Sequence, residues 1–396
     1  MSSVSILGIM TGTSCDAADA VCVNFSKKGS FVSEKLVFSF STKFPKQLRK
    51  KILALQTGKE NFITMLKTEQ EYSAWIAAIC IKLLRKYRLS PFKTAIAVHG
   101  QTLWHAPTGK NPFSLQILNP NILSSKTGCV VISNFRQTDI ALGGQGAPLV
   151  PLYYCMRAKS LNLKNRLPFS IHNIGGIANL AIVTNDFNRC LAFDTGPGNT
   201  LIDMATDRFT KGKLNYDKNG QIAQKHIDQV DVNKIKNLAM SKYFLKKPPK
   251  STGKEMFNQD FLKKFKSKSG RLIAETTAFT AYTMALSYQK YVFPKFKNLK
   301  EIRLAGGGAR NLTLVALFKK YLAMLSKRRI SILTIESSFA PAQFLESIAF
   351  ARLGWEALHA KPTSLASVTG AKKNAVGVRI TTSENFLKIM NQINRS

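Results

Sequence analysis

The chain has 396 residues, 45% of them hydrophobic, and carries 58 Lys and Arg against 22 Asp and Glu, a formal net charge of +36. This length exceeds the usual size of one hydrophobic core, so two domains are expected. The longest apolar runs, such as residues 74–81, end after about two helical turns and exclude a membrane-spanning helix.

The composition also indicates a location. Six widely scattered cysteines without a CxxC pair favour reduced thiols over a disulfide scaffold or a zinc site. No basic region precedes the apolar segment 6–9, which resembles a strand and not a signal peptide. We therefore expect a cytoplasmic protein without a membrane partner.

The positive charge favours anionic ligands, including nucleic acid. However, the lysines are spread along the chain, and none of the denser groups is interleaved with a recognisable nucleic-acid-reading module. We expect solvated basic faces and no specific nucleic-acid partner.

The first predicted elements are two apolar strands, 5–10 and 20–23, joined by the small, hydroxyl-rich segment Thr11–Asp16. Such a hairpin tip exposes N–H and O–H donors that suit a phosphate chain, and Asp16 could hold Mg²⁺ directly or through water. An ordinary hairpin without a ligand is the alternative.

Residues 44–87 have helical periodicity and are interpreted as structural cover. The next predicted strand, 94–98, ends in His99-Gly100-Gln101-Thr102. Polar side chains after a buried strand lie where open α/β sheets bind ligands. We expect Gln101 and Thr102 to contact a substrate, and His99 to be a hydrogen-bonded structural residue.

A strand at 130–132 precedes Arg136, whose guanidinium near the Gly-rich loop 143–148 could hold a carboxylate or a phosphate. Further on, residues 170–180 form a predicted strand that turns at Gly175-Gly176 and returns as a second strand. This hairpin repeats the N-terminal one and indicates a duplicated nucleotide-clamping fold.

The segment Phe193–Asn199 holds one carboxylate in a Gly-Pro-Gly turn. We expect Asp194 at the carboxyl end of a short strand, 191–193, followed by a helix start near Leu201. In that position Asp194 could transfer protons, or it could simply cap the helix. The sequence pattern alone leaves both open.

The remaining segments are read in the same way. Residues 246–253 are predicted to be a loop and 276–291 a helix. The strand 302–305 runs into Gly306-Gly307-Gly308, a bare backbone on which a purine or ribose can lie. A final helix from Ala342 presents Glu346, a carboxylate that is costly on an apolar segment unless it faces a site.

Eight motifs, in this order, resemble those of the anhydro-N-acetylmuramic acid kinase family of the actin–Hsp70–hexokinase superfamily. They cover nearly the whole chain, at residues 10–14, 99–102, 143–151, 173–179, 193–199, 248–253, 306–309 and 368–371.

The resemblance implies an α/β fold of two actin-like (ribonuclease H-like) domains around an ATP cleft, with mixed sheets flanked by helices. The first domain would comprise residues 1–140 plus 348–396 and the second 141–347. The implied ATP site, with Mg²⁺ at Asp16, consists of Gly12, Thr13, Ser14, Cys15, Asp16, Ala17, Ala18, Asp19, Asn173, Gly175, Gly176, Gly306, Gly307, Gly308 and Ala309. The sugar site consists of Gln101, Thr102, Arg136, Gly144, Gln145 and Glu346.

The implied reaction is ATP-dependent phosphorylation of 1,6-anhydro-N-acetylmuramic acid with hydrolytic opening of the anhydro ring, in cell-wall recycling. Asp194 matches the catalytic aspartate that deprotonates the attacking water. A levoglucosan-type kinase and a non-catalytic ATP-binding relative are the alternatives, and the resemblance suggests a possible homodimer. The chain departs from the family pattern at four positions: Ala17 stands for a usual glycine, Asn134 for a usual aspartate, Thr11 for a usual serine and Lys254 for a usual arginine.

Overall fold

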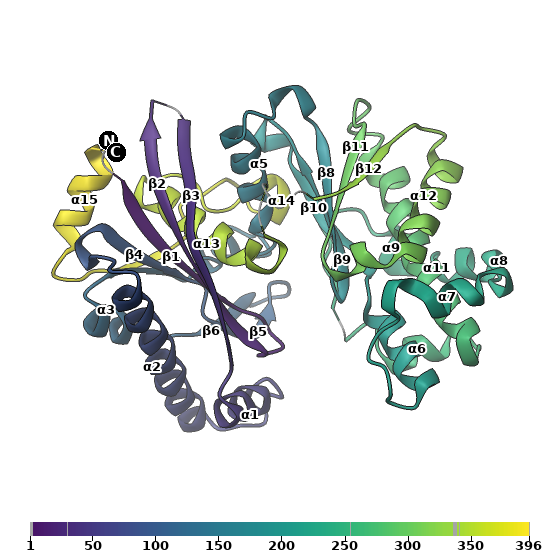
Figure 1. Ribbon diagram of the computed structural model, residues 1–396, viewed down its shortest axis with the longest axis horizontal. Helices are drawn as coiled ribbons and strands as arrows, with labels where there is room; N and C mark the ends of the chain where they lie inside the picture. Colours follow the sequence, from purple (N-terminus) through teal and green to yellow (C-terminus); the bar gives the residue numbers. More distant parts are fainter. Residues whose placement is uncertain (1–2, 30, 254, 336–338, 340, 396) are drawn as a thin grey trace. The chain divides into compact units, whose positions relative to one another are not determined.

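The computed structural model describes residues 3–29, 31–253, 255–335, 339 and 341–395. Contacts between residues divide the chain into two compact units, Met1–Asn162 with Ser337–Ser396 and Leu163–Glu336 (Figure 1). The first division therefore falls after Asn162, whereas the sequence placed it after residue 140. The reason is that helix α5 (Val150–Ser160) packs against β3 (Phe31–Lys43) and α13 (Leu345–Leu358) of the first unit.

The first unit is built on a six-stranded sheet in the order β13-β7-β4-β1-β2-β3. Strands β1, β2 and β3 form an antiparallel meander, β4 and β7 run parallel to β1, and β13 is antiparallel to β7. A separate hairpin pairs β5 with β6. The bounds of the strands not yet given are β1 Val4–Thr11, β2 Ala17–Lys28, β4 Thr94–Val98, β5 Gln101–Ala106, β6 Phe113–Ile117, β7 Val130–Ser133 and β13 Arg379–Thr381.

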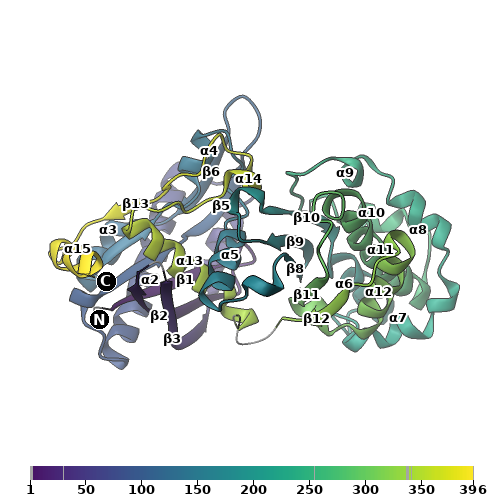
Figure 2. The ribbon, with the colours of Figure 1, turned by 90° about the horizontal axis from the view of Figure 1, so that it is seen from above.

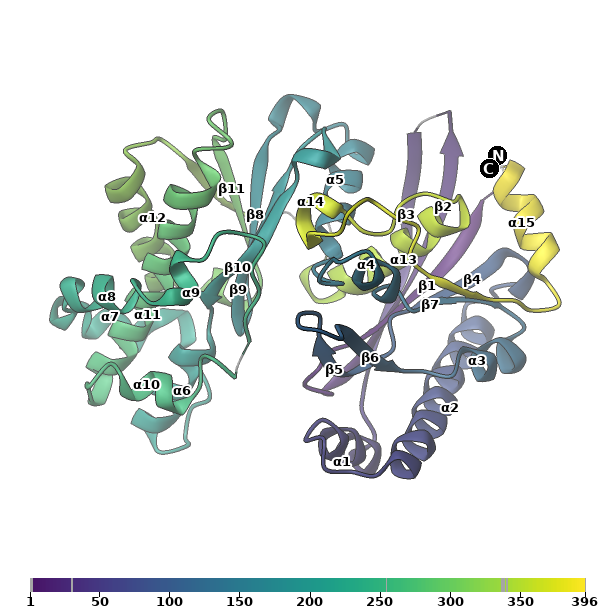
Figure 3. The same ribbon diagram turned by 180° about the vertical axis from the view of Figure 1, so that it is seen from behind.

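Alternate residues of β1 point to opposite sides of the sheet, and those on both sides are buried. Both faces of the sheet are therefore covered by helices. Leu7 and Ile9 share a hydrophobic cluster with α2, while a Cβ added at Gly8 would overlap the backbone of α13, so this strand and helix touch directly. Figure 3 shows α1, α2 and α3 together on one side of the sheet. The remaining helical bounds are α1 Lys46–Leu55, α2 Phe62–Lys86, η1 Pro91–Lys93, α3 Pro120–Thr127, α4 Gln137–Ala141, η8 Ala342–Phe344, α14 Ala366–Thr369 and α15 Phe386–Arg395.

The second unit has a five-stranded sheet in the order β10-β9-β8-β11-β12, with its helices gathered on one side (Figure 2). Helix α11 is buried along almost its whole length and forms the centre of the core. The bounds are η2 Lys164–Arg166, β8 Phe169–Ile174, β9 Ile177–Val183, η3 Phe187–Arg189, β10 Leu191–Pro197, α6 Thr200–Thr210, η4 Lys218–Gly220, α7 Gln221–Lys225, η5 Ile227–Gln229, α8 Val232–Leu238, α9 Lys242–Leu245, α10 Gln259–Lys263, α11 Ser269–Ser287, the π-helix η6 Tyr288–Val292, β11 Glu301–Ala305, η7 Gly307–Arg310, α12 Leu312–Ser326 and β12 Ser331–Thr334.

The two sheets repeat one topology. In each, three consecutive strands form an antiparallel meander, and the first of them pairs on its other side with a fourth strand in parallel, followed by a fifth. This repetition confirms the predicted α/β class of two actin-like domains with mixed sheets flanked by helices, and the duplication inferred from the two hairpins.

Three expectations about single elements were wrong. The strand that holds Asp194 does not end before it but continues to Pro197. The helix predicted at 276–291 begins at Ser269, and the helix after Ala342 is not the last, because α14 and α15 follow it. All six cysteines are buried and none of them forms a disulfide, and no helix among the described residues is long and apolar enough to cross a membrane.

Candidate active site

Asp194 lies in an irregular part of β10. Asp194 pairs with Asn179 and Gly196 with Ala178, so Thr195 is the extra residue of a β-bulge. The Thr195 hydroxyl donates to the Ala178 carbonyl at 3.1 Å, and His172 Nε2 therefore donates to Thr195 at 3.1 Å. Burial lowers the pKa of His172 to about 3, so this histidine is neutral and structural.

Three hydrogen bonds hold Asp194. Its N–H donates to the Lys250 carbonyl at 3.1 Å, its carbonyl accepts from the Tyr243 hydroxyl at 2.7 Å, and Oδ2 accepts from Thr252 N–H at 2.9 Å. Burial raises the pKa of Asp194 to about 6, and the Thr252 N–H bond opposes that shift. A fixed carboxylate with a pKa near the working pH suits a general base.

Backbone bonds join the β8–β9 hairpin to the turn after Asp194. The N–H groups of Gly198 and Thr200 both donate to the Gly176 carbonyl, at 2.8 and 3.1 Å, and Asn199 N–H donates to Gly175 at 2.8 Å. Helix α11 supports the same turn, since the buried Thr280 hydroxyl donates to the Gly198 carbonyl at 3.0 Å. These hydrogen bonds join the hairpin and the turn into one assembly.

The glycine loop after β11 packs on this assembly. Gly306 has a φ of +80°, and a Cβ there would lie 2.6 Å from Asn173 Oδ1. A Cβ at Gly308 would overlap the side chain of Ile174. Only glycine permits this approach. The structure therefore brings together the predicted ATP residues of the second unit, at 173–176 and 306–309, beside the turn that follows Asp194.

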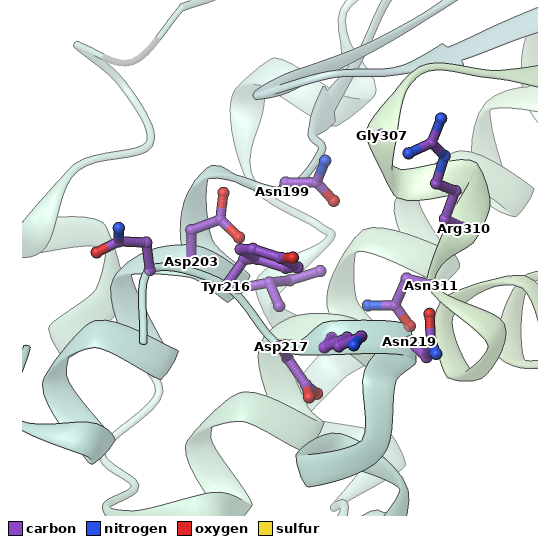
Figure 4. Close-up of a pocket in the computed structure, with 11 residues that line it drawn as sticks. Asn199, Asp203, Tyr216, Asp217, Asn219, Gly307, Arg310 and Asn311 are labelled. Atoms are coloured by element: carbon purple, nitrogen blue, oxygen red, sulfur yellow. The ribbon is translucent and has the colours of Figure 1, made fainter. Parts of the chain in front are cut away.

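A cavity of about 580 Å³ opens next to the glycine loop (Figure 4). Most of its lining residues are of polar type, and they come from the start of α6, the segment before α7, η7 and the cap of α12. The lining residues are Asn199, Ile202, Asp203, Asn215, Tyr216, Asp217, Lys218, Asn219, Gly307, Arg310 and Asn311. Of these residues, only Gly307 was expected at a site from the sequence. The Asn219-Gly220 pair signals a turn, but no sequence pattern places that turn beside Gly307.

The predicted phosphate-binding tip of the first unit is braced by side chains. Arg49 of α1 donates from Nε to the Cys15 carbonyl at 3.0 Å and from Nη2 to the Ser14 carbonyl at 3.2 Å. It also pairs with Asp16 at 3.3 Å. Cys15 has a φ of +54° and is buried, whereas Gly12, Thr13 and Ser14 are exposed.

Two glutamines complete the brace. Gln101 Nε2 donates to the Gly12 carbonyl at 3.2 Å, and Gln56 Nε2 bridges the carbonyls of Thr13 and Thr102 at 3.2 and 3.0 Å. Gln101 is fully buried. The geometry therefore makes Gln101 a support of the tip, while Thr102 lies beside it under the same bridge.

Arg136 is oriented by a histidine. His99 Nδ1 donates to the Gly100 carbonyl at 2.8 Å, so its Nε2 is free to accept from Arg136 Nε at 2.8 Å. Burial and the Arg136 charge lower the pKa of His99 to about 3, which keeps it neutral. Burial also lowers the pKa of Arg136, to about 10, and the carboxylate of Glu346 opposes this. His99 is thus structural, as expected, and Arg136 and Glu346 act on each other electrostatically.

The loop that contains Gly144 and Gln145 is organised by Asp139, which the sequence analysis did not single out. Asp139 Oδ2 accepts from Gly146 N–H and Oδ1 from the Thr369 hydroxyl, both at 2.7 Å. Gln145 N–H donates to the Thr369 carbonyl at 2.9 Å, and a Cβ at Gly144 would overlap the Asp139 carboxylate. This explains why motifs at 143–151 and 368–371 occur together.

Comparison with known proteins decides the family. The sequence model of the family described as "Anhydro-N-acetylmuramic acid kinase" matches residues 4–382 of this chain. The chain belongs to the anhydro-N-acetylmuramic acid kinase family. Proteins of that name from Coxiella burnetii, Clostridioides difficile and Caldanaerobacter subterraneus subsp. tengcongensis are 37%, 34% and 33% identical to this chain. The alignments cover 96%, 95% and 94% of this chain and 98%, 97% and 95% of the relatives.

Two of the four departures from the anhydro-N-acetylmuramic acid kinase pattern, at Ala17 and Asn134, fit their places in this fold, and Lys254 lies outside the described residues. Ala17 pairs with Lys43 in regular β-structure and does not have a positive φ, so its Cβ causes no strain. Asn134 has a φ of +58°, a region that asparagine and aspartate tolerate better than most residues. Neither change disturbs the local backbone.

The Mg²⁺ site expected at Asp16 has one carboxylate. Asp16 is exposed and paired with Arg49, and the described residues contain no group of three or more His, Cys, Asp or Glu that could hold a metal. Mg²⁺ commonly uses one or two carboxylates together with substrate phosphates and water. Asp16 fits that role, with the nucleotide supplying the other ligands.

Proposed function

We propose that this chain transfers the γ-phosphoryl group of ATP to O6 of 1,6-anhydro-N-acetylmuramic acid while water opens the anhydro ring. The products are N-acetylmuramate 6-phosphate and ADP, in peptidoglycan recycling. The observation that carries the proposal is Asp194, a carboxylate with a pKa of about 6 held beside the β8–β9 hairpin and the glycine loop. Family membership supports the same substrate.

Asp194 would act on water. O6 of the anhydro sugar is bonded to C1 and carries no proton. The Asp194 carboxylate takes a proton from water as the water oxygen bonds to C1, the C1–O6 bond breaks, and O6 bonds to the γ-phosphorus as ADP leaves. A positioned general base contributes about 10²- to 10⁴-fold to such a step.

ATP would use the two hairpins and the cavity. The nucleoside fits the 580 Å³ cavity, where Tyr216 offers a ring and Asn199 and Asn311 offer amides beside Gly307 (Figure 4). Backbone N–H groups of the hairpin tips at 12–19 and 173–176 would bind the phosphates. Mg²⁺, held through Asp16 and the nucleotide, would neutralise phosphate charge.

The sugar would be recognised by Arg136, Thr102, Gly144, Gln145 and Glu346, while Gln101 supports the phosphate tip. Because His99 fixes its Nε and the Gly146 carbonyl accepts from its Nη1 at 3.4 Å, Arg136 can direct the N–H groups that remain to the lactyl carboxylate. A levoglucosan-type kinase would not need that cation. Faster turnover of substrates with a lactyl carboxylate, lost in Arg136→Met, distinguishes the two.

We further propose a cytoplasmic location, a homodimer and no specific nucleic-acid partner. Light scattering tests the dimer, and binding to nucleic acid that persists at physiological salt would contradict the last statement.

The decisive test is ATP-dependent turnover of 1,6-anhydro-N-acetylmuramic acid in H₂¹⁸O. Label at the anomeric hydroxyl of a 6-phosphorylated product is expected from the wild type and from the control Asp207→Asn, which removes a carboxylate from α6 outside the site. Asp194→Asn should lose about 10²- to 10⁴-fold of turnover. An unlabelled product, or full activity in Asp194→Asn, would refute the mechanism, and a wild type without product would refute the proposed function.

A further inference from the structure

Lys250 is a buried lysine next to Asp194. The residue is only 3% exposed, and its Nζ lies 4.6, 5.0 and 5.5 Å from the ring centroids of Tyr291, Tyr243 and Phe193. Among the described residues, no carboxylate lies within ion-pair distance of this ammonium group. Buried lysines are rare unless other groups stabilise them. The reaction proposed above gives Lys250 no task.

The ammonium is held by aromatic faces and by the end of helix α9. Its Nζ donates to the carbonyls of Tyr243 and Phe244 at 3.3 and 3.4 Å. Lysines commonly bond the last carbonyls of a helix, and ring faces attract cations. Burial, together with the charges of Lys290 and Lys246, still lowers the pKa of Lys250, to about 8. The surroundings of Lys250 therefore disfavour its charged form.

The backbone around Lys250 holds Asp194. The Lys250 carbonyl accepts the Asp194 N–H, and two residues later Thr252 N–H donates to the Asp194 carboxylate. Tyr243, whose ring and carbonyl hold the ammonium, donates its hydroxyl to the Asp194 carbonyl. The side chain of Lys250 therefore anchors the same loop that sets the position of Asp194.

We propose that Lys250 is a positioning residue for Asp194. Its ammonium, bound between three rings and two carbonyls of α9, fixes residues 250–252 so that Thr252 N–H meets the carboxylate in a single orientation. Lys250 acts through the loop and makes no contact with substrate. This inference rests on the proposed role of Asp194 as the general base.

The test compares Lys250→Met with Lys246→Met. Both remove one positive charge from the same stretch of chain, but Lys246 is exposed and its side chain has no part in holding Asp194. Turnover of 1,6-anhydro-N-acetylmuramic acid is measured from pH 5 to 9, with the KM for ATP. In Lys250→Met, kcat should fall about 10- to 100-fold while the KM for ATP changes less than about twofold.

The acid limb of the pH profile, where turnover falls as the pH decreases, distinguishes a positioning role of Lys250 from a role in packing alone. The Thr252 N–H bond and the Lys250 charge both lower the pKa of Asp194, so losing them should move the acid limb upward by about 0.5 to 1 pH unit. Lys246→Met should keep the wild-type limb. If Lys250→Met does not fold, Lys250→Gln retains a donor for one carbonyl and should show a smaller shift in the same direction.

Wild-type kcat and an unmoved acid limb in a folded Lys250 variant would overturn the inference. So would failure of both variants to fold, because Lys250 would then serve the stability of the unit. These outcomes are distinct from failure of the proposed function, which shows as a wild type and Lys246→Met that make no 6-phosphate at all.

Discussion

The two units contain the same hairpin held in two different ways. In the second unit, the β8–β9 tip is fixed by backbone bonds from Gly198, Asn199 and Thr200 and by glycines that allow the backbones to touch. In the first unit, the β1–β2 tip is fixed by the side chains of Arg49, Gln56 and Gln101. One topology can therefore hold a predicted phosphate-binding tip in two ways: by close backbone packing, as in the second unit, or by long polar side chains, as in the first. The first kind tolerates no added volume at the glycines where two backbones touch, and the second can be weakened one side chain at a time.

The largest effect is expected for Gly198→Ala. A Cβ there would overlap the Gly175 carbonyl and lie 3.1 Å from the carbonyl carbon of Ile177, so backbone must move. We expect kcat/KM to fall about 100-fold and the free energy of unfolding to fall by about 2 kcal/mol. In the control Gly175→Ala, the Cβ meets its nearest neighbour at 3.5 Å, and stability should be nearly unchanged. Equal stability of the two variants in urea unfolding would contradict the backbone brace.

The next effect concerns pH. A general base must be ionised, so kcat/KM should rise as pH rises through about 6, and should be about tenfold lower at pH 5 than on the plateau. This limb belongs to Asp194 in the second unit, so Arg49→Met should leave it in place. A limb that moves with Arg49→Met would show that the first unit controls the titration.

The same raised pKa of Asp194 predicts that the variant Asp194→Asn is more stable than the wild type near neutral pH. A carboxyl whose pKa rises from 3.8 to about 6 on folding stabilises the fold at low pH, and that contribution is lost as pH rises through about 6. At pH 7.5, Asp194→Asn should therefore raise the free energy of unfolding by about 1 to 3 kcal/mol. At pH 4 the gain should be much smaller. A melting temperature below that of the wild type at pH 7.5 would refute this.

A smaller effect is expected from the side-chain brace. Arg49→Met removes two bonds to the tip and the pair with Asp16, and should raise the KM for ATP about fivefold. Arg49 is partly exposed, so stability should change little. The control Lys51→Met, on the same helix α1 as Arg49, breaks an exposed ion pair with Glu71 of α2, and its KM for ATP should match the wild type.

The smallest effect is expected for Gln56→Ala. It removes one amide that bridges the carbonyls of Thr13 and Thr102, and water can replace these bonds at an exposed tip. We expect a rise of about twofold in the KM for ATP. The double variant with Arg49→Met shows whether the braces are coupled: a KM above the product of the two single effects would mean that they act as one unit.

The sequence predicted the buried strands that precede several candidate site residues. His99 and Gly306 come directly after the apolar runs 94–98 and 302–305, and Arg136 follows the run 130–132 after three residues. These runs can be recognised without knowing their neighbours, and the structure has a strand at each of them. The bulge at Thr195 could not be predicted, because it depends on the register of β10 against β9. A strand that appeared to end at Phe193 therefore continues past Asp194.

The side chains that support the candidate site could not be predicted from the sequence either. Arg49 and Gln56 belong to a segment whose apolar spacing predicts only a helix, and nothing local shows that their polar ends reach the tip. The same holds for Tyr216 and Asn311, which meet at the cavity only because α6 and α12 pack around α11. Such contacts are set by tertiary packing, which residue spacing does not encode.

The burial of α11 determines how easily the hydrogen bonds of the turn after Asp194 can open. Thr280 in that helix donates to the Gly198 carbonyl, so the turn after Asp194 is bonded to the most enclosed helix of its unit. Amide hydrogens at Gly198 and Thr200 should exchange with deuterium only when the whole unit unfolds, whereas those at Thr13 and Ser14 exchange through local openings. The base thus stays in place as long as its unit is folded, whereas the exposed tip of the first unit can open while its own unit remains folded.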